Sequence, residues 1–319
     1  MLSPAPTTGT ATPVVLFVYR RHEQLPRTLE CLREAGARHL YVFSDGPVDE
    51  EAAADVERVR ALLGTIDWVQ PVIVSHEDNL GLSASIRTGL DYVFEHHETA
   101  IVTEDDVCVA PEFCRYAERA LAHYAGAERV AGLTGLRLPF DRGALAGYEF
   151  DVFLSPRFSS WAWATWRSRW RRFSFDADEL RSRLVASEDF RPWRAGADLP
   201  AMIHDAVLTE TLGGSWDVFC ATNMLLEGSG FVTPTWNMVE NSGLEEGSHA
   251  AGPSRLKLAW ERDQAPAIDA LRFAPPAEDE QILRAYRRFF TEGAGGPLAR
   301  LRTSVAGRRA TGRITRGRP

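Results

Sequence analysis

Short apolar runs alternate with amphipathic stretches through the first 135 residues of the chain. Four runs read as strands, and they cover residues 14–19 (VVLFVY), 39–45 (HLYVFSD), 70–76 (QPVIVSH) and 100–106 (AIVTEDD). The stretches between them carry apolar residues at helical spacing, as Ile86, Leu90 and Val93 do. A strand roughly every 30 residues with a helix between is typical of βαβ units. The pattern predicts an α/β fold with a mostly parallel central sheet and helices on both faces.

The pattern changes after a further helix at residues 112–124 and a fifth strand at residues 130–135. Trp163, Trp166, Trp170 and Phe173 follow at helical spacing, which predicts a helix with a packed aromatic stripe. Later helices are expected at residues 201–212, 216–226 and 279–290. We therefore expect an α/β half at 13–135 fused to a mixed half at 136–292, with a disordered stretch at 1–12 and a flexible tail at 293–319.

Charge is distributed unevenly along the chain. The net charge is −8, which argues against nucleic acid as a partner. Residues 293–319 contain seven arginines and no acidic residue. A solvated, disordered tail explains this composition, and peripheral contact with an anionic membrane is the alternative.

The four cysteines, Cys31, Cys108, Cys114 and Cys220, show no CxxC spacing, so we expect scattered reduced thiols rather than a disulfide framework. The first residues have neither a basic start nor an apolar core, and an apolar run of about 18 residues is missing. These features predict a cytoplasmic protein, with the inner face of the membrane as the peripheral site if the tail binds lipid.

Acidic residues gather where the predicted strands end. Asp45 ends the second strand, Asp78 follows the third, and Glu104, Asp105 and Asp106 end the fourth. In open α/β sheets, ligands bind beyond the carboxyl ends of the strands. Three adjacent carboxylates repel one another unless a divalent cation, arginines or raised pKa values relieve them. The alternative is that Asp105 and Asp106 merely cap the next turn, but three acids exceed what capping needs.

Other nucleotide-binding classes lack their motifs here. The chain has one lysine, Lys257, and no GxxxxGK[ST] loop, which excludes a P-loop ATPase. The first strand leads into YRRHEQ rather than GxGxxG, so dinucleotide binding is disfavoured. The glycine-rich loop and lysine of a sugar nucleotidyltransferase are also missing. Phosphate would therefore be handled by metal and by arginines, for which Arg20, Arg21 and Arg87 are candidates, although each could equally form a surface ion pair.

At this point the run AIVTEDDVCVAPEFCRYAERAL resembles the DxD segment of GT-A glycosyltransferases, a Rossmann-like nucleotide-sugar-binding fold. It is most similar to the inverting N-acetylglucosaminyltransferase I type, as are VVLFVYRRHEQLPRTLECL and FSDGP. NLGLSASIRTGL resembles an element of family-two glycosyltransferases. The resemblance covers residues 13–135 and thins to scattered elements beyond 150, where the acceptor side of the fold would lie.

The resemblance implies roles for the donor-side residues. Asp106 would ligate Mn²⁺ or Mg²⁺, and the metal would hold the donor diphosphate. Asp105 would bind the ribose or the donor sugar, and Glu104 would contact the sugar or order the loop. The remaining donor-binding candidates are Asp45 for the base, Asn79 in the NLG element, and Arg20 or Arg21 with Arg87 for base and phosphates.

Inverting transfer needs a general base, and Asp217 in GSWDVF is our candidate. The alternative is a helix start in which Ser215 is the N-cap and Asp217 favours the helix dipole. Asp205 and Glu210 are weaker rivals. His249, in the loop ENSGLEEGSHA, is a candidate metal ligand or diphosphate contact, or an ordinary surface histidine.

Three further residues are candidates for a sugar pocket, because they lie in loops next to predicted elements. They are Trp161, Trp236 and Asn237.

The expectation from all of these features is a metal-dependent glycosyltransferase, a hexosyl- or N-acetylhexosaminyltransferase. Its donor would be a nucleotide-diphosphate sugar, UDP-linked by preference, and its acceptor a hydroxyl of a glycan, a lipid-linked sugar or a small molecule. A bacterial-type surface glycan is the natural setting. The alternatives are a sugar nucleotidyltransferase and a non-catalytic carbohydrate-binding protein on a degenerate GT-A fold.

Overall fold

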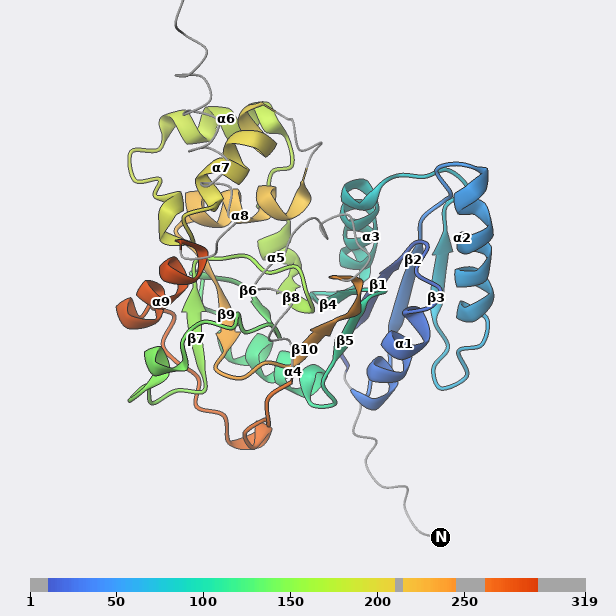
Figure 1. The fold of residues 1–319 in the computed structure, drawn as a ribbon, viewed down its shortest axis with the longest axis horizontal. Coiled ribbons are helices and arrows are strands. Elements are labelled where there is room, and N and C mark those ends of the chain that lie inside the picture. Colours follow the sequence, from blue (N-terminus) through green and yellow to red (C-terminus); the bar gives the residue numbers. More distant parts are fainter. Residues whose placement is uncertain (1–10, 210–214, 245–261, 292–319) are drawn as a thin grey trace, which may run out of the picture.

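A computed structural model describes residues 11–209, 215–244 and 262–291, and every structural statement below concerns these residues (Figure 1). The fold is α/β, with an eight-stranded sheet in the order β3-β2-β1-β4-β8-β6-β9-β7 and a second sheet formed by β10 and β5. The strands are β1 (Val14–Val18), β2 (Leu40–Ser44), β3 (Val72–Ser75), β4 (Thr99–Glu104), β5 (Val107–Val109), β6 (Val130–Thr134), β7 (Val152–Ser155), β8 (Trp163–Trp166), β9 (Gly230–Pro234) and β10 (Val239–Asn241).

The first half of the sheet is parallel, as the sequence predicts. β1 pairs with β2 and with β4, and β2 pairs with β3, all in parallel register. Every residue of β1 is at most 4% exposed, because the strand is flanked on both edges and covered on both faces. The carboxyl ends of β1, β2 and β4 therefore lie together at one edge of the sheet, which is where a ligand site is expected.

The aromatic stripe is not one helix, so that prediction was wrong. Trp163–Trp166 form β8, which pairs antiparallel with β4 and β6 in the middle of the sheet, and only Arg167–Trp170 are helical (α5). In a strand, residues three apart point to opposite faces. Trp163 packs in the core on one face and Trp166 in the core on the other. Aromatic residues three and four positions apart are compatible with a helix, but aromatic residues also favour strands. Here the pairing of residues 163–166 with β4 and β6 makes them a strand.

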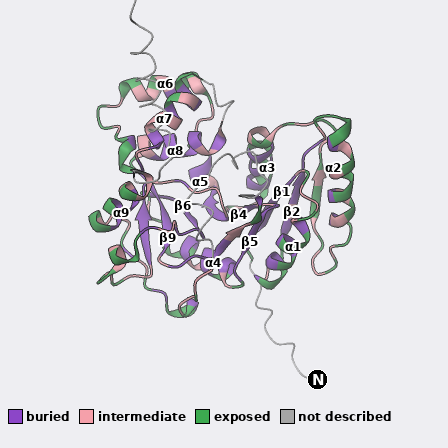
Figure 2. Cartoon of the chain, in the orientation of Figure 1, coloured by how far each residue is buried: buried purple, intermediate pink, exposed green. Residues whose placement is uncertain are grey.

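Helices cover both faces of the large sheet (Figures 1 and 2). α1 (Leu25–Glu34), α2 (Glu50–Leu63) and α4 (Phe113–Tyr124) contribute to one core. α3 (Leu82–His96), α5, α6 (Ala177–Ala186), α7 (Leu199–Ile203) and α8 (Trp216–Glu227) contribute to the core on the opposite face. α9 (Glu280–Thr291) packs on a smaller cluster with Phe140 and Phe153.

Most of the other helices and strands predicted from the sequence are present in the structure. Eight predicted elements are confirmed, with most of their ends within three residues of the prediction. They are the strands at 14–19, 39–45, 70–76, 100–106 and 130–135 and the helices at 112–124, 216–226 and 279–290. The helix expected at 201–212 is α7 followed by a π-helical turn, His204–Leu208, and residues 210–214 lie outside the described part. β5, β7, β9 and β10 were not predicted. In the described residues, the helices are too short or too polar to cross a bilayer.

One continuous sheet runs through both proposed halves, since β6 lies between β8 and β9. The proposed disordered N-terminus and basic tail lie outside the described residues, apart from Ala11 and Thr12, whose amides donate to Oε1 of Glu118.

Candidate functional site

Glu104, Asp105 and Asp106 lie where the central strand β4 turns into β5. The side chains of Asp105 and Asp106 are 5% and 7% exposed. The backbone amide of Tyr19, at the end of β1, donates to Oδ2 of Asp105 over 2.9 Å, and the Thr28 hydroxyl donates to the Asp105 carbonyl over 2.8 Å. The acids are thus held by β1 and α1 rather than by a helix start, so capping the next turn does not account for them.

One guanidinium serves this cluster. Nη1 of Arg21 lies 3.2 Å from Oδ1 of Asp105 and 2.5 Å from Oδ2 of Asp106. Burial, and then the charges of Asp106 and Asp105, raise the pKa of Glu104 to about 8. Burial raises the pKa of Asp105 to about 6 although Arg21 opposes the shift, and burial also raises the pKa of Asp106. Three carboxylates with one counter-charge leave negative charge that a hard cation would neutralise.

Ser242 and Gly243, to which the sequence analysis assigned no role, lie against Asp106. β10 pairs antiparallel with β5, and this places the residues after β10 beside the acids. The Ser242 amide donates to the Asp106 carbonyl over 2.9 Å. A Cβ on Gly243 would lie 1.9 Å from Oδ2 of Asp106, so a larger residue at position 243 would displace the Asp106 carboxylate. The glycine is visible in the sequence ENSG, but its place beside Asp106 follows only from the pairing of β10 with β5.

Asp217 lies in the first turn of α8. The negative charge of Asp217 is close enough to contribute to the raised pKa of Glu104. The Ser215 hydroxyl donates to Oδ1 of Asp217 over 2.6 Å and makes no cap hydrogen bond to the helix backbone. Ser215 therefore orients the Asp217 carboxylate. The rival Asp205 is half exposed and contacts His204.

Asp45 and Asn79 brace the loop before α3. Oδ1 of Asp45 accepts from the Gly46 and Leu80 amides, over 2.9 and 2.8 Å, and Oδ2 accepts from the Gly81 amide over 3.0 Å. Nδ2 of Asn79 donates to the Gly46 carbonyl over 2.8 Å. The hydrogen bonds of both side chains therefore join the end of β2 to the start of α3, at the edge of the site.

Arg20 and Arg87 turn away from the acid cluster. Nε of Arg20 lies 3.8 Å from Oδ2 of Asp55 on α2. The Arg87 guanidinium lies 5.0 Å from the centre of the Phe175 ring. Among the described residues, Arg21 is thus the one candidate arginine that ion-pairs with Asp105 and Asp106.

The three residues predicted to line a sugar pocket pack in or against the protein core. Trp236 is 4% exposed and meets the Tyr116 ring edge-on, with the centroids 5.6 Å apart. Asn237 is 1% exposed, and its Oδ1 accepts from the Arg137 amide over 3.3 Å. Trp161 is half-buried against the core, and its carbonyl accepts from the Thr134 hydroxyl. Trp236 and Asn237 therefore offer little surface to a ligand.

His249, the second predicted metal residue, lies outside the described residues, as does Glu210. Within 11–209, 215–244 and 262–291, three or more His, Cys, Asp or Glu side chains do not come together in an arrangement that could hold a metal. A cation at Asp106 would therefore need further oxygens from phosphate, water or residues beyond these ranges.

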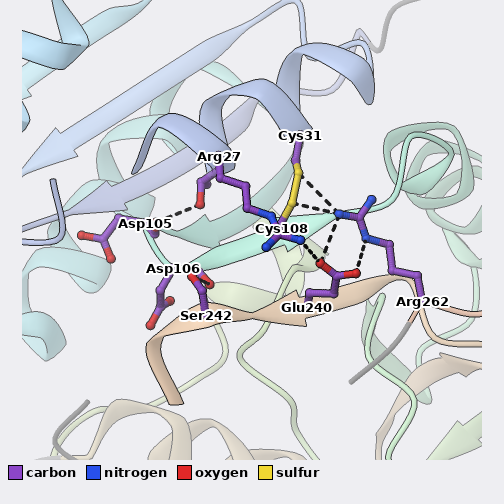
Figure 3. The surroundings of a disulfide bond; sticks show 9 residues. Arg27, Cys31, Asp105, Asp106, Cys108, Glu240, Ser242 and Arg262 are labelled. Atoms are coloured by element: carbon purple, nitrogen blue, oxygen red, sulfur yellow. Dashed lines mark hydrogen bonds and ion pairs between the residues drawn. A yellow bond between two sulfur atoms is a disulfide. The ribbon is translucent and has the colours of Figure 1, made fainter. Parts of the chain in front are cut away.

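Cys31 on α1 and Cys108 on β5 form a disulfide, with Cα atoms 5.6 Å apart, so the expectation of reduced thiols was wrong for this pair (Figure 3). The two positions are 77 residues apart in sequence, and only the packing of α1 on β5 brings them together. Arg27 and Arg262 flank the bridge and share the Glu240 carboxylate. Cys114 and Cys220 are free and buried, as expected for reduced thiols.

The raised pKa of Glu104 predicts a stability that falls as pH rises. In the unfolded chain this carboxyl ionises near pH 4.5, and in the folded chain near pH 8. Between these values the folded state keeps a proton that the unfolded state has lost, so the free energy of unfolding decreases from pH 5 to pH 8, by a few kcal/mol at most. Asp105 adds to this decrease up to about pH 6.

Urea denaturation of the metal-free protein at pH 5 to 8 measures this dependence. Glu104→Gln should flatten the curve between pH 6 and 8, whereas the exposed control Glu57→Gln should keep the parent slope. Parallel curves for parent and Glu104→Gln would contradict the shift.

Neither family models nor curated proteins match this chain. Among solved structures, the chain is similar in fold to a mannosyltransferase from Pyrobaculum calidifontis, described in complex with GDP-Man and Mn²⁺. The two are 16% identical with a TM-score of 0.46, over 98% of this chain and 79% of the other. Similarity at this level carries no conclusion about activity, which has to come from the site.

Proposed function

We propose that the chain is a metal-dependent glycosyltransferase that moves a hexosyl or N-acetylhexosaminyl group from a nucleotide-diphosphate sugar to an acceptor hydroxyl. The observation that carries the proposal is the cluster of three acids at the carboxyl end of a central parallel strand, compensated by Arg21 alone among the described residues. We further propose a UDP-linked donor, inversion at the transferred carbon, and an acceptor on a glycan, a lipid-linked sugar or a small molecule.

Asp106 offers Mn²⁺ or Mg²⁺ a carboxylate, and the rest of the ligand shell would come from donor phosphate, water or residues outside the described ranges. Carboxylate oxygens are the ligands that hard cations prefer. Burial, more than any other cause, raises the pKa values of Glu104 and Asp105, and a bound cation would oppose that shift by stabilising the ionised carboxylates. Asp106 would hold the metal, with His249 as a further candidate ligand. When bound, the metal would neutralise the charge that develops on the departing nucleoside diphosphate.

The chain's own residues divide the remaining tasks. Arg21, at the end of β1, can pair with donor phosphates through its fork of N–H groups. Asp105 would accept a hydrogen bond from a donor hydroxyl, and Asp45 and Asn79 would hold the loop against which the base rests. Arg20 and Arg87 would have to rotate from their present partners to reach the donor.

Asp217 would act as the general base. Ser215 binds one of its oxygens, Oδ1, while Oδ2 has no hydrogen-bond partner among the described residues. This free oxygen can accept the proton of an acceptor hydroxyl as that oxygen attacks the sugar.

A thermal-shift screen tests the proposal. The full chain is heated with nucleotide sugars, with and without Mn²⁺. One nucleotide sugar should raise Tm only when Mn²⁺ is present, because the metal would link its diphosphate to the protein. A ligand at 100 times its Kd stabilises the folded state by about 2.7 kcal/mol. Stabilisation by glycans without metal would instead indicate a carbohydrate-binding protein. Release of pyrophosphate from sugar phosphate and nucleoside triphosphate would indicate a nucleotidyltransferase.

A further inference from the structure

The bridge between Cys31 and Cys108 lies next to the acid cluster (Figure 3). Cys108 is on β5, two residues after Asp106, so the bridge and the acids share one short stretch of chain. Cys31 is on α1, three residues after Thr28, and residues three apart lie on the same face of a helix. The Thr28 hydroxyl donates to the Asp105 carbonyl over 2.8 Å. The bridge therefore joins two of the elements that hold the acids.

The strand beside β5 is connected to the acids in the same way. Glu240 on β10 is the register partner of Cys108, and Ser242 follows Glu240 by two residues. The Ser242 amide donates to the Asp106 carbonyl over 2.9 Å, and the Ser242 hydroxyl donates to it over 3.2 Å. A displacement of Cys108 would thus be passed to Asp106 along both strands of this small sheet.

Opening the bridge requires space that this part of the protein does not have. Cys31 and Cys108 are 5% and 4% exposed, and Val107 and Val109 are fully buried. Two thiols keep their sulfurs further apart than a disulfide bond does, and a close-packed interior accepts such a change only by moving. α1 is a ten-residue helix anchored by buried leucines, whereas β5 and β10 have three residues each and form a two-stranded sheet of their own. The displacement should therefore fall on β5 and β10.

We propose that Cys31 and Cys108 form a thiol–disulfide switch of the acid site. The bridged form holds Asp106 in the position described above. Reduction by a cellular dithiol moves β5 and β10 and weakens binding at the acids. The switch itself rests on the geometry of the bridge, and its effect on a nucleotide sugar with Mn²⁺ rests on the proposed function.

The reduction is an ordinary thiol–disulfide exchange. One thiolate of the dithiol attacks Sγ of Cys31, the S–S bond breaks, and Cys108 leaves as a thiolate. Nη2 of Arg262 lies 3.0 Å from Sγ of Cys108, where its positive charge stabilises the departing sulfur. The second thiol of the reductant then displaces Cys31. Two electrons and two protons pass to the cysteines, and the dithiol becomes a disulfide. A dithiol reaches the nearly buried sulfurs when β5 and β10 open locally.

Hydrogen exchange of the full, metal-free chain tests the switch. The amides of Tyr19 and Ser242 report on the acids, because they donate to Oδ2 of Asp105 and to the Asp106 carbonyl. After reduction with dithiothreitol, exchange in the peptides that contain these amides should become about fivefold faster or more, as expected for coupled sites. Peptides from β7, at the far edge of the large sheet, should keep their rates. Reoxidation should restore slow exchange.

Thermal shift with a nucleotide sugar and Mn²⁺ measures the effect on binding. The reduced protein is freed of dithiothreitol under nitrogen, and its apparent Kd should be about fivefold higher or more than that of the bridged protein. The double variant Cys31→Ser with Cys108→Ser should not respond to dithiothreitol in either assay. Cys114→Ser, which removes a free, fully buried thiol on α4, should respond as the parent does.

Unchanged exchange at Tyr19 and Ser242 in the reduced, folded protein would overturn the switch. A bridge that does not form on oxidation, or that opens only when the whole chain unfolds, would also overturn it. If a nucleotide sugar with Mn²⁺ binds the bridged and reduced forms equally, the switch alone fails. If neither form binds any nucleotide sugar while reduction still speeds exchange at both amides, the transferase proposal fails and the switch stands.

Discussion

Asp106→Asn is expected to abolish the Mn²⁺-dependent stabilisation by a nucleotide sugar and to lower sugar transfer by about a hundredfold or more. A bound metal contributes several kcal/mol to the stabilisation of a departing phosphate, and Asp106 is its proposed protein ligand. Thermal shift with and without Mn²⁺ measures binding, and nucleoside diphosphate release measures transfer. The metal-free variant should fold, because Arg21 still pairs with Asp105 over 3.2 Å.

The matched control is Asp67→Asn, which removes one exposed carboxylate outside the site. It should keep both metal-dependent binding and transfer. If Asp106→Asn bound the nucleotide sugar with Mn²⁺ as tightly as the parent does, the metal would not be held at Asp106, and the reading of the acid cluster as a donor site would be lost.

Asp217→Asn is expected to lower transfer by about 10²–10⁴-fold while leaving metal-dependent donor binding unchanged. This range is what a positioned general base contributes, and the amide cannot take a proton from the acceptor hydroxyl. The Ser215 hydroxyl can still donate to the amide oxygen, so the local geometry is kept. Donor turnover and thermal shift, measured on the same preparation, separate the two effects.

Asp205→Asn is the control for this variant, because Asp205 is the rival acid and lies in the π-helical turn after α7. It should retain transfer. Full activity in Asp217→Asn together with its loss in Asp205→Asn would move the base to the rival position.

The strand-helix rhythm of the first half was predictable because it is local. Apolar runs such as Val14–Val18 indicate buried strands, and their regular alternation with amphipathic helices indicates a parallel sheet. Trp163–Trp166 differ, because both spacings, that of a helix and that of a strand, fit the same tryptophans. Their state depends on pairing with β4, which lies 64 residues earlier and leaves no trace in the local pattern.

The candidate site divides in the same way. Strand-end acids and the arginine that follows β1 can be found by locating the carboxyl ends of strands. The partners of Asp45 cannot, because whether its oxygens face a ligand or the amides of Leu80 and Gly81 depends on how a loop closes. The contact of Gly243 with Asp106 is likewise invisible without the pairing of β10 and β5.

The bridge between Cys31 and Cys108 changes the covalent topology of the chain. It closes a ring that contains β2, α2, β3, α3 and β4, and hence three of the four strands of the parallel half. A cut at any loop inside that ring leaves the two pieces covalently joined. The chain enters this ring at Cys31 on α1 and leaves it at Cys108 on β5. Asp106, in the acid cluster, is only two residues inside the second of these points.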